Sequence, residues 1–228
     1  SNKQFTVLND RSQGGASIKD GQLELMVHRR MYVDDHFGVG EPLNETGITG
    51  KGLVVRGKHY VFLDSVADSG QLHRDLGERL YMGPPVSFAE LTTTPQDYNK
   101  TLKSYWSGLK VALPANVHLL TLEQWKAATF LLRLEHFYER NEDATLSKPT
   151  TVSLKGLFSP FVIDKVVELT LGANEELEDA KRLAWNVENM GSTRPAMSDY
   201  VTPVTGDAIE VTLQPMQIRT FQVHIIEP

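Results

Sequence analysis

Hydrophobic and polar residues alternate along most of this chain, and the alternation constrains its fold more than any other feature. Within Gln22–Arg29, for example, Leu23, Leu25 and Val27 share one side, and the residues between them share the other. Successive side chains of a β-strand point to opposite faces, so a period of two predicts a half-buried strand. Strand patterns recur in Leu53–Arg56, His59–Leu63, Val117–Glu123, Thr129–Phe137, Thr150–Leu154, Phe161–Leu171, Ile209–Leu213 and Met216–Ile225. About ten short strands separated by Gly, Pro and Asn predict an all-β fold of antiparallel β-sandwiches.

Three local patterns add detail to this prediction. The strand patterns on either side of Gly57-Lys58 predict a tight hairpin. In the last strand the apolar residues change phase between Ile218 and Phe221, which predicts a bulge or a change of sheet near Arg219-Thr220. Ala173–Trp185 alone shows a helical pattern, so we expect a helix there.

Composition narrows the classes of function. The 228 residues are 40% hydrophobic, which is enough to build a core although the chain has no cysteine for disulfides. The 23 basic and 29 acidic residues give a formal charge of −6, so we expect no nucleic-acid partner. No apolar run reaches the roughly 18–20 residues of a membrane span, and Ser1–Leu8 lacks the plan of a signal peptide. We therefore expect no membrane partner and no targeting segment within this chain.

The composition changes in Thr92–Lys110. A polar stretch that opens with Thr92-Thr93-Thr94-Pro95 precedes a Leu/Val-rich run after Pro114. This change predicts two domains, residues 1–108 and 109–228.

Most motifs that carry chemistry are absent from the sequence. Seven histidines stand at positions 28, 36, 59, 73, 118, 136 and 224, but none has the H-x-H or H-E-x-x-H spacing that presents two metal ligands together. We expect no metal site in this chain. Neither a G-x-S-x-G nucleophile motif nor a phosphate-binding or dinucleotide-binding glycine motif occurs. His118 and His136 fall in strands, where packed and hydrogen-bonded roles are expected, and the acidic run 175–179 predicts a solvated surface.

One loop could form a site. Asp34–Pro42 combines two carboxylates, an imidazole, an aromatic ring and two glycines directly after Arg29-Arg30. Such loops at strand ends carry binding sites more often than strands do. The competing interpretation is that Asp34 and Asp35 only accept hydrogen bonds from the backbone and from the two arginines and thereby hold a turn. The two carboxylates of a glycosidase lie ~5–10 Å apart across the sugar, whereas adjacent side chains point apart, so these aspartates are not an acid and nucleophile pair.

A series of ordered motifs spans nearly the whole chain. They are Thr6-Val7-Leu8-Asn9-Asp10-Arg11-Ser12-Gln13-Gly14-Gly15, Asp20-Gly21, Glu24-Leu25-Met26-Val27-His28-Arg29-Arg30, Asp34-Asp35, Gly38-Val39-Gly40-Glu41-Pro42-Leu43, Val117-His118-Leu119-Leu120-Thr121-Leu122, Leu131-Leu132-Arg133-Leu134-Glu135-His136, Leu157-Phe158-Ser159 and Pro215-Met216-Gln217-Ile218-Arg219-Thr220-Phe221. In this order the motifs closely resemble the C-terminal region of lysosomal α-mannosidases, which belong to glycoside hydrolase family 38.

The resemblance implies a fold, an activity and partners. The fold would be the end of the large family 38 C-terminal β-sandwich followed by a smaller terminal sandwich. The family's enzymes are retaining exo-α-mannosidases that remove terminal α-mannose from N-glycan oligosaccharides. Their zinc ligands, nucleophile and acid/base carboxylate lie in an N-terminal catalytic domain. This chain would therefore hold no catalytic residue and no cofactor. It would pack on that zinc-bearing domain, and the full enzyme would lie in the lysosome lumen or be secreted and could form a homodimer.

The resemblance also assigns a role to the loop. Family 38 enzymes bring a loop from their C-terminal sandwiches to the rim of the catalytic pocket, which implies that Asp34, Asp35, His36 and Phe37 contact substrate there. Many relatives carry an arginine where this chain has Phe37, and a phenyl ring cannot donate that hydrogen bond. Phe37 could still stack on a sugar face. It also leaves open a mannosidase-derived protein that has lost activity.

Two N-glycosylation sequons, Asn44-Glu45-Thr46 and Asn99-Lys100-Thr101, fall in predicted loops and agree with a secretory route to the lysosome. The alternative function is a stand-alone carbohydrate-binding or adhesive β-sandwich, with Trp106 and Trp125 as a possible platform or, more simply, as core or interface residues. The mannosidase interpretation predicts a large exposed apolar patch, and the alternative predicts a self-contained polar surface.

Overall fold

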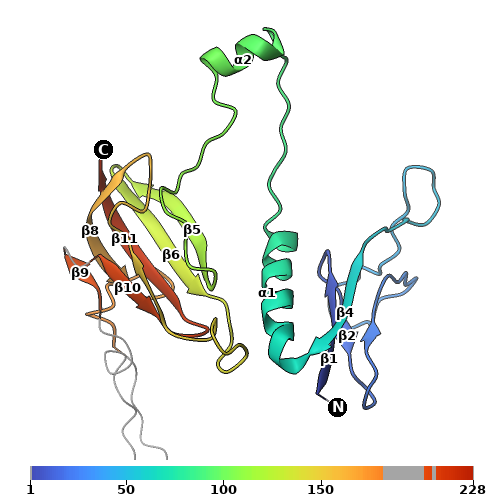
Figure 1. Ribbon diagram of the computed structural model, residues 1–228. Helices are drawn as coiled ribbons and strands as arrows, with labels where there is room; N and C mark the ends of the chain where they lie inside the picture. The colour runs from blue at the N-terminus through green and yellow to red at the C-terminus, as the bar shows by residue number, and fades with distance from the viewer. Residues whose placement is uncertain (1, 182–202, 207–208, 228) are drawn as a thin grey trace, which may run out of the picture. The chain divides into compact units, whose positions relative to one another are not determined.

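The computed structural model describes residues 2–181, 203–206 and 209–227, and the chain falls into two units, Ser1–Pro85 and Val86–Pro228 (Figure 1). Strands make up most of the regular structure of the described residues, and every strand pair among them is antiparallel. The predicted all-β class is therefore confirmed. No helix within the described residues is long and apolar enough to cross a membrane.

The C-terminal unit is built from two sheets. A five-stranded sheet has the order β5-β6-β11-β8-β9, and a two-stranded sheet pairs β10 with β7. The strands are β5 Val117–Lys126, β6 Thr129–His136, β7 Thr150–Ser153, β8 Val162–Leu169, β9 Thr205–Gly206, β10 Glu210–Leu213 and β11 Ile218–Ile226. Of these, all but the two-residue β9 were predicted from their alternation.

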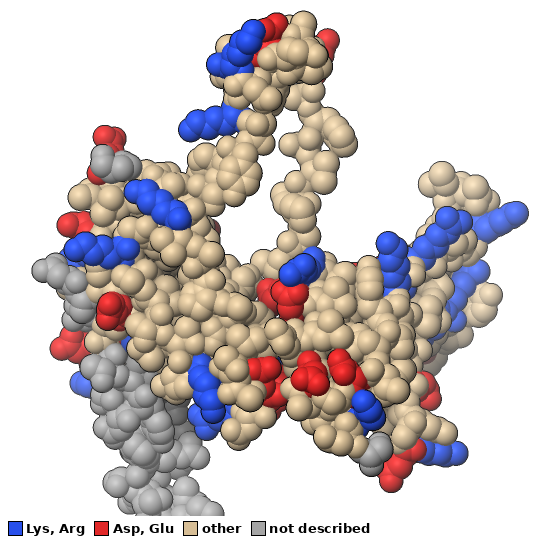
Figure 2. Space-filling model, in the orientation of Figure 1, with Lys and Arg blue, Asp and Glu red and all other residues tan. Residues whose placement is uncertain are grey.

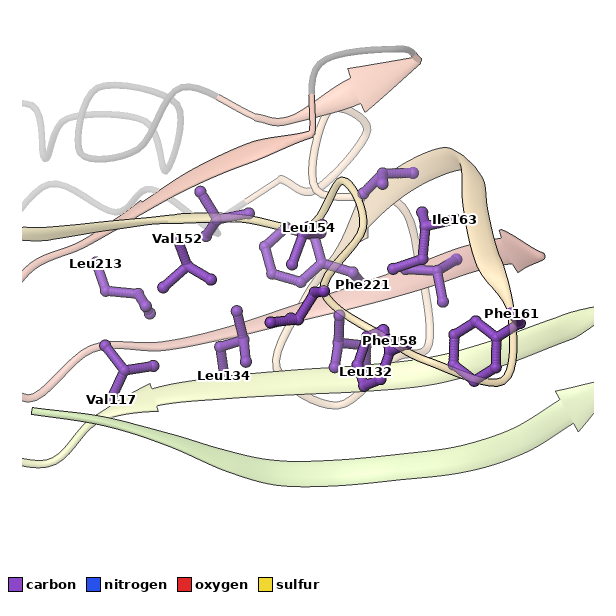
Figure 3. Packing of buried hydrophobic residues seen from close by; sticks show 14 residues of the cluster. Val117, Leu132, Leu134, Val152, Leu154, Phe158, Phe161, Ile163, Leu213 and Phe221 are labelled. Atoms are coloured by element: carbon purple, nitrogen blue, oxygen red, sulfur yellow. The ribbon is translucent and has the colours of Figure 1, made fainter. Parts of the chain in front are cut away.

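The hydrophobic core lies between these two sheets (Figure 3). Leu132, Leu134 and Phe221 point inward from the large sheet, and Val211 and Leu213 meet them from the small one. All five are fully buried. Burying such a side chain stabilises the fold by about 1.5–3 kcal/mol, so this unit has a core of its own.

A buried ion pair joins the two sheets. Arg219 on β11 donates from Nε to Oε1 of Glu168 on β8 at 2.7 Å, and its Nη2 donates to Glu168 Oε2. Its Nη1 reaches across to the carbonyl oxygen of Thr212 on β10 at 2.9 Å. Glu168 Oε2 also accepts the backbone N–H of Val204 at 2.9 Å. This one pair therefore connects β11, β8, β10 and the segment that enters β9.

We predict that Glu168→Ala lowers the free energy of unfolding of the C-terminal unit by about 3–5 kcal/mol, because it leaves Arg219 buried without its carboxylate partner. Urea denaturation measures this loss. Glu123→Ala is the matched control on exposed β5 and should change stability by less than about 0.5 kcal/mol. A loss for Glu168→Ala no larger than that of the control would contradict the prediction.

The N-terminal unit contains two short sheets and one helix. Strand β1 (Lys3–Asn9) pairs with β4 (His59–Ser65), and β2 (Gly15–Ala16) pairs with β3 (Glu24–Leu25). The predicted hairpin around Gly57-Lys58 is wrong. Leu53–Arg56 forms no strand, and β4 finds its partner in β1, which was not predicted. The long strand predicted over Gln22–Arg29 is likewise reduced to the two residues of β3.

Two helices lie in segments where none was predicted. Helix α1 spans Val66–Tyr81 and is capped by Ser65, whose hydroxyl accepts the N–H of Asp68 at 3.1 Å. Helix α2 spans Pro95–Thr101 and begins after Thr94, whose hydroxyl accepts the N–H of Asp97. In both cases Ser or Thr stands three residues before Asp, which is a helix-start signal.

The carboxylate of Asp97 also pairs with Lys100. The Lys100 ammonium and the Thr94 hydroxyl hold the pKa of Asp97 below its usual value. Because the folded pKa is depressed, the stabilisation from these contacts persists at mildly acidic pH and is lost only as the pH falls through that lowered pKa.

Two further predictions are wrong in the described residues. Between 173 and 181 the chain forms turns and an isolated bridge instead of the expected helix, and the remainder of Ala173–Trp185 lies outside the described residues. No bulge occurs at Arg219-Thr220. The alternation of apolar residues changes phase for two reasons. Met216, with a φ of 63°, belongs to the turn before β11, and Arg219 takes a core-facing position that an apolar residue would otherwise hold. The register irregularity of β11 falls instead between His224 and Ile225.

Candidate functional site

The loop from Met31 to Leu43 is closed at its base. The N–H of Met31 donates to the carbonyl oxygen of Leu43 at 3.0 Å, and the N–H of Asn44 donates to that of Pro42 at 2.9 Å. Just outside this closure, Arg30 Nε donates to the side-chain oxygen of Asn44 at 2.8 Å. We call residues 31–43 the rim loop.

The four predicted site residues form the turn of the rim loop. Asp34 is half-buried, with a side chain 18% exposed, and its Oδ1 lies 3.4 Å from Nδ1 of the exposed His36. Asp35 Oδ1 accepts the backbone N–H of Phe37 at 3.0 Å. His36 has a φ of 62°, which few residues other than glycine adopt, and Phe37 is 93% exposed. The turn therefore holds Phe37 outward.

This geometry decides between the two interpretations only in part. Asp35 accepts a backbone hydrogen bond and so does hold the turn, as one interpretation expected. Within the described residues, however, Asp34 and Asp35 make no hydrogen bond to Arg29 or Arg30, because Arg30 turns to Asn44. The two aspartates face different partners, which agrees with the argument that they are not an acid and nucleophile pair. The arrangement offers an aromatic surface beside a carboxylate and an imidazole, groups that can bind a sugar.

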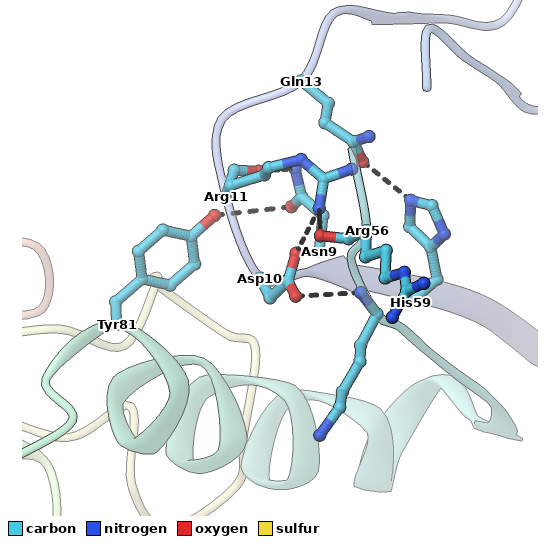
Figure 4. A network of polar contacts seen from close by, with 8 residues as sticks. Asn9, Asp10, Arg11, Gln13, Arg56, His59 and Tyr81 are labelled. Carbon is cyan, nitrogen blue, oxygen red and sulfur yellow. Dashed lines mark hydrogen bonds and ion pairs between the residues drawn. The ribbon is translucent and has the colours of Figure 1, made fainter. Parts of the chain in front are cut away.

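A polar network fixes the end of the β1–β4 ladder (Figure 4). Arg11 Nη1 donates to Asp10 Oδ1 at 2.9 Å and to the carbonyl oxygen of Arg56 at 3.2 Å. Asp10 Oδ2 accepts the N–H of Lys58 at 2.8 Å. The guanidinium lies directly over Gly57, where an added Cβ would stand 1.5 Å from Nη1. A glycine at this position allows the close approach. Similar contacts tie Gln13 to His59 and Tyr81 to Asn9.

We predict that Gly57→Ala displaces Arg11 and accelerates hydrogen exchange of the Lys58 amide about fivefold, since the bonds it loses are worth about 1 kcal/mol. In an Arg11→Ala background the same change should have little further effect. Gly77→Ala in α1 is the control, because an added Cβ there meets no atom within 4 Å. Equal effects of Gly57→Ala with and without Arg11 would refute this explanation.

Two protein-family models match parts of the chain, one in each unit. Residues 116–221 match the model described as the glycosyl hydrolases family 38 C-terminal β-sandwich domain, and residues 1–37 match the family 38 C-terminal domain. The chain belongs to glycosyl hydrolase family 38 and corresponds to the C-terminal region of its members. The region shared with the second model ends at Phe37, within the rim loop.

Similar family 38 proteins include lysosomal α-mannosidases. The chain is 47% identical to that of Mus musculus over 97% of its own length, and 45% identical to that of Homo sapiens over 98%. It is 39% identical to the α-mannosidase of Canavalia ensiformis over 96%. The chain spans only 21%, 22% and 23% of these three proteins, so it corresponds to about a fifth of the length of the relatives it matches.

The other singled-out residues of this family 38 chain lie outside the rim loop. His136 is fully buried, with Nε2 2.9 Å from the carbonyl oxygen of Lys148, and His118 lies 3.4 Å from Glu135 across β5 and β6. Both are packed, hydrogen-bonded residues, as predicted. Trp106 and Trp125 are 65% and 42% exposed, so neither is a core residue.

The charged and glycosylation residues show the same separation from the rim loop. The acidic side chains at 175, 176, 178 and 179 are exposed, as predicted for a solvated surface. Asn44 lies in a loop, whereas the loop predicted around Asn99 is wrong because that residue belongs to helix α2. Both asparagines are exposed. Figure 2 shows basic and acidic side chains interspersed on the visible face of the C-terminal unit. Among the described residues, no three His, Asp or Glu side chains gather to hold a metal ion.

Sequence reasoning missed the residues that hold the family 38 loops in place. Nothing in the local pattern indicates that Arg30 reaches Asn44, because the two lie 14 positions apart and meet only when the rim loop closes. The Arg11–Gly57 contact likewise requires the unpredicted β1–β4 pairing. The Arg219–Glu168 pair could have been found, since each residue interrupts an apolar face of a predicted strand.

Proposed function

We propose that this chain is the non-catalytic C-terminal β-sandwich portion of a lysosomal-type retaining exo-α-mannosidase, and that it packs on the N-terminal catalytic domain. The observation that carries the proposal is that the N-terminal unit has no buried hydrophobic core of its own. No hydrophobic side chain in its described residues is buried; only Ser69 and Gly70 are. An isolated two-stranded sheet is marginally stable at best in water, and helix α1 adds no fully buried hydrophobic side chain to this one.

The uncovered surface of this unit is specific. Phe5 stands opposite Leu63 across β1 and β4, and Val7 stands opposite Val61, so the four side chains share one face. Helix α1 contacts the other face, where the hydroxyl of Thr6 lies 3.4 Å from that of Ser69. Apolar pairs on an open sheet face favour coverage by another part of a larger protein. Because this chain matches about a fifth of its relatives, the catalytic domain or the sandwich strands that precede this region are the proposed cover.

The remaining parts of the proposal follow if this chain is part of such a mannosidase. Asp34, Asp35, His36 and Phe37 would contribute to the pocket rim and contact terminal α-mannose of N-glycan oligosaccharides, while zinc and the catalytic carboxylates would lie in the N-terminal domain. The enzyme would act in the lysosome lumen, in line with the names of its mammalian relatives. Asn44 and Asn99 would carry glycans, and the whole enzyme could be a homodimer.

The domain division at 108/109 also belongs to this proposal. The C-terminal unit begins at Val86, but the chain bonds to the sandwich only near residue 108, where the Gly108 carbonyl oxygen accepts the N–H of Ser159 and Lys110 donates to Leu157. The match to the terminal sandwich model begins at residue 116. Limited proteolysis that cuts between 86 and 107 and leaves an intact C-terminal fragment would support the division.

The first experiment is to purify the protein natively and assay a chromogenic α-mannoside at acidic pH. Activity that tracks with a larger polypeptide containing, or associated with, this chain supports the proposal. A single inactive 25.5 kDa species that is stably folded would reject it.

We predict that Leu63→Lys weakens association with the catalytic part by at least tenfold, because a buried, unpaired charge is costly. Co-purification or sedimentation measures the association. Ile48→Lys is the control, since Ile48 is a similarly apolar residue that is fully exposed and lies outside the β1–β4 face. Equal behaviour of the two variants would mean that this face is not the docking surface.

We further predict that Phe37→Ala raises the KM for a mannose oligosaccharide about three- to tenfold at constant thermal stability, since one apolar contact is worth roughly 1 kcal/mol or somewhat more. Phe88→Ala removes an equally exposed phenyl ring outside the rim loop and serves as the control. An unchanged KM for Phe37→Ala would remove Phe37 from the rim.

The alternative, a stand-alone carbohydrate-binding module, is favoured by one observation, the exposure of Trp106 and Trp125. It predicts that the chain alone binds mannan and that Trp106→Ala or Trp125→Ala abolishes binding. The uncovered face of β1 and β4 argues against a self-contained module.

A further inference from the structure

Arg30 contacts three parts of the chain, at Tyr32, Asn44 and Gly52. Its Nε donates to the side-chain oxygen of Asn44 at 2.8 Å, and its guanidinium carbon lies 5.0 Å from the centre of the Tyr32 ring. A Cβ on Gly52 would stand 3.5 Å from its Nη1, so the guanidinium also lies beside that glycine. A planar cation that stacks on an aromatic ring while donating from its edge is a role that lysine cannot reproduce.

These contacts surround the base of the rim loop. Arg30 and Asn44 flank the hydrogen bond between the N–H of Met31 and the carbonyl oxygen of Leu43. Beyond Asn44, Thr46 and Gly52 form an isolated antiparallel bridge. This bridge holds the segment around Gly52 beside the guanidinium of Arg30. The Asp34–Phe37 turn has no buried hydrophobic anchor of its own, so its position depends on this closure.

Asn44 is also the acceptor residue of a sequon, and the geometry keeps its two roles apart. Arg30 uses Oδ1 of Asn44. An N-linked glycan attaches at Nδ2 and leaves Oδ1 as an amide oxygen, so glycosylation removes no atom from the Arg30 bond. Asn44 is exposed, which allows a glycan to extend into solvent.

We propose that Arg30 and Asn44 form a clamp that positions the rim loop, and that Asn44 serves in the clamp through Oδ1 while carrying a glycan on Nδ2. This inference rests on the proposed function, because the rim role of the turn is part of it. Arg30 and Asn44 are positioning residues that act through the Asp34–Phe37 turn.

The test uses the whole active enzyme expressed in cells that glycosylate. Arg30→Ala and Asn44→Ala should each raise the KM for a mannose oligosaccharide about three- to tenfold, with kcat and the thermal midpoint unchanged, because an exposed charged hydrogen bond contributes roughly one RT to a few RT. Both should accelerate hydrogen exchange of the Met31 amide. Asn44→Asp retains an acceptor oxygen and should recover most of the loss.

Thr46→Val is the matched control that separates the glycan from the clamp. It removes the hydroxyl that the sequon requires while keeping Asn44 and the branched shape of the side chain. We expect mass spectrometry to show loss of one glycan, with KM and Met31 exchange as in the wild type. A rise in KM equal to that of Asn44→Ala would assign the effect to the glycan and overturn the clamp.

Two other results would overturn the proposal. Faster Met31 exchange in Arg30→Ala with an unchanged KM would mean that the clamp does not position a substrate-contacting loop. An Asn44 without glycan in the wild type would reject the dual role. A wild-type enzyme without mannosidase activity would instead refute the proposed function, while Met31 exchange would still report on the clamp.

Discussion

The buried pair of Arg219 and Glu168 is the interaction on which the C-terminal sandwich depends most. Charges are costly to bury unless each is fully hydrogen-bonded, and here the guanidinium and the carboxylate satisfy each other while each also bonds to backbone. Their extra partners come from different places: Thr212 belongs to the small sheet and Val204 to the segment entering β9. Because the guanidinium reaches β10 from β11, the pair links the two sheets at one fixed position. Phe221, whose ring centre lies 5.7 Å from the guanidinium carbon, joins the pair to the core.

The N-terminal unit follows the opposite principle. Its order comes from backbone pairing and polar contacts such as that of Asp10 with Arg11 and Lys58, and its apolar residues face outward. Polar contacts at a surface orient the chain but contribute little free energy, so these contacts alone stabilise the unit only weakly. One chain thus joins a sandwich with its own core to a unit whose β1–β4 face carries exposed apolar side chains.

The sequence predicted the sandwich far better than the N-terminal unit, for a physical reason. Strands such as Glu210–Leu213 are buried on one face by the chain itself, so their alternation is strict and readable. In Gln22–Arg29 the same alternation yields only the two residues of β3, and Leu23 and Val27 stay exposed because no part of this unit covers them. Helix α1 was not predicted because it buries no hydrophobic side chain, so its sequence lacks a clear apolar face. Ser65 and Asp68 nevertheless form a helix-start signal that could have been used.

The rim loop shows what sequence and structure contribute separately to a site. The residue types of Asp34–Phe37 could be selected from sequence because carboxylate, imidazole and phenyl groups are crowded together. Their arrangement could not, because it depends on a positive φ at His36 and on a hydrogen bond from the Phe37 amide to Asp35. These local terms turn the phenyl ring outward, and a side chain of any chemistry at position 37 would project in the same direction. Phe37 therefore presents an apolar surface that cannot donate a hydrogen bond, while the backbone turn that holds it outward does not depend on the phenyl group.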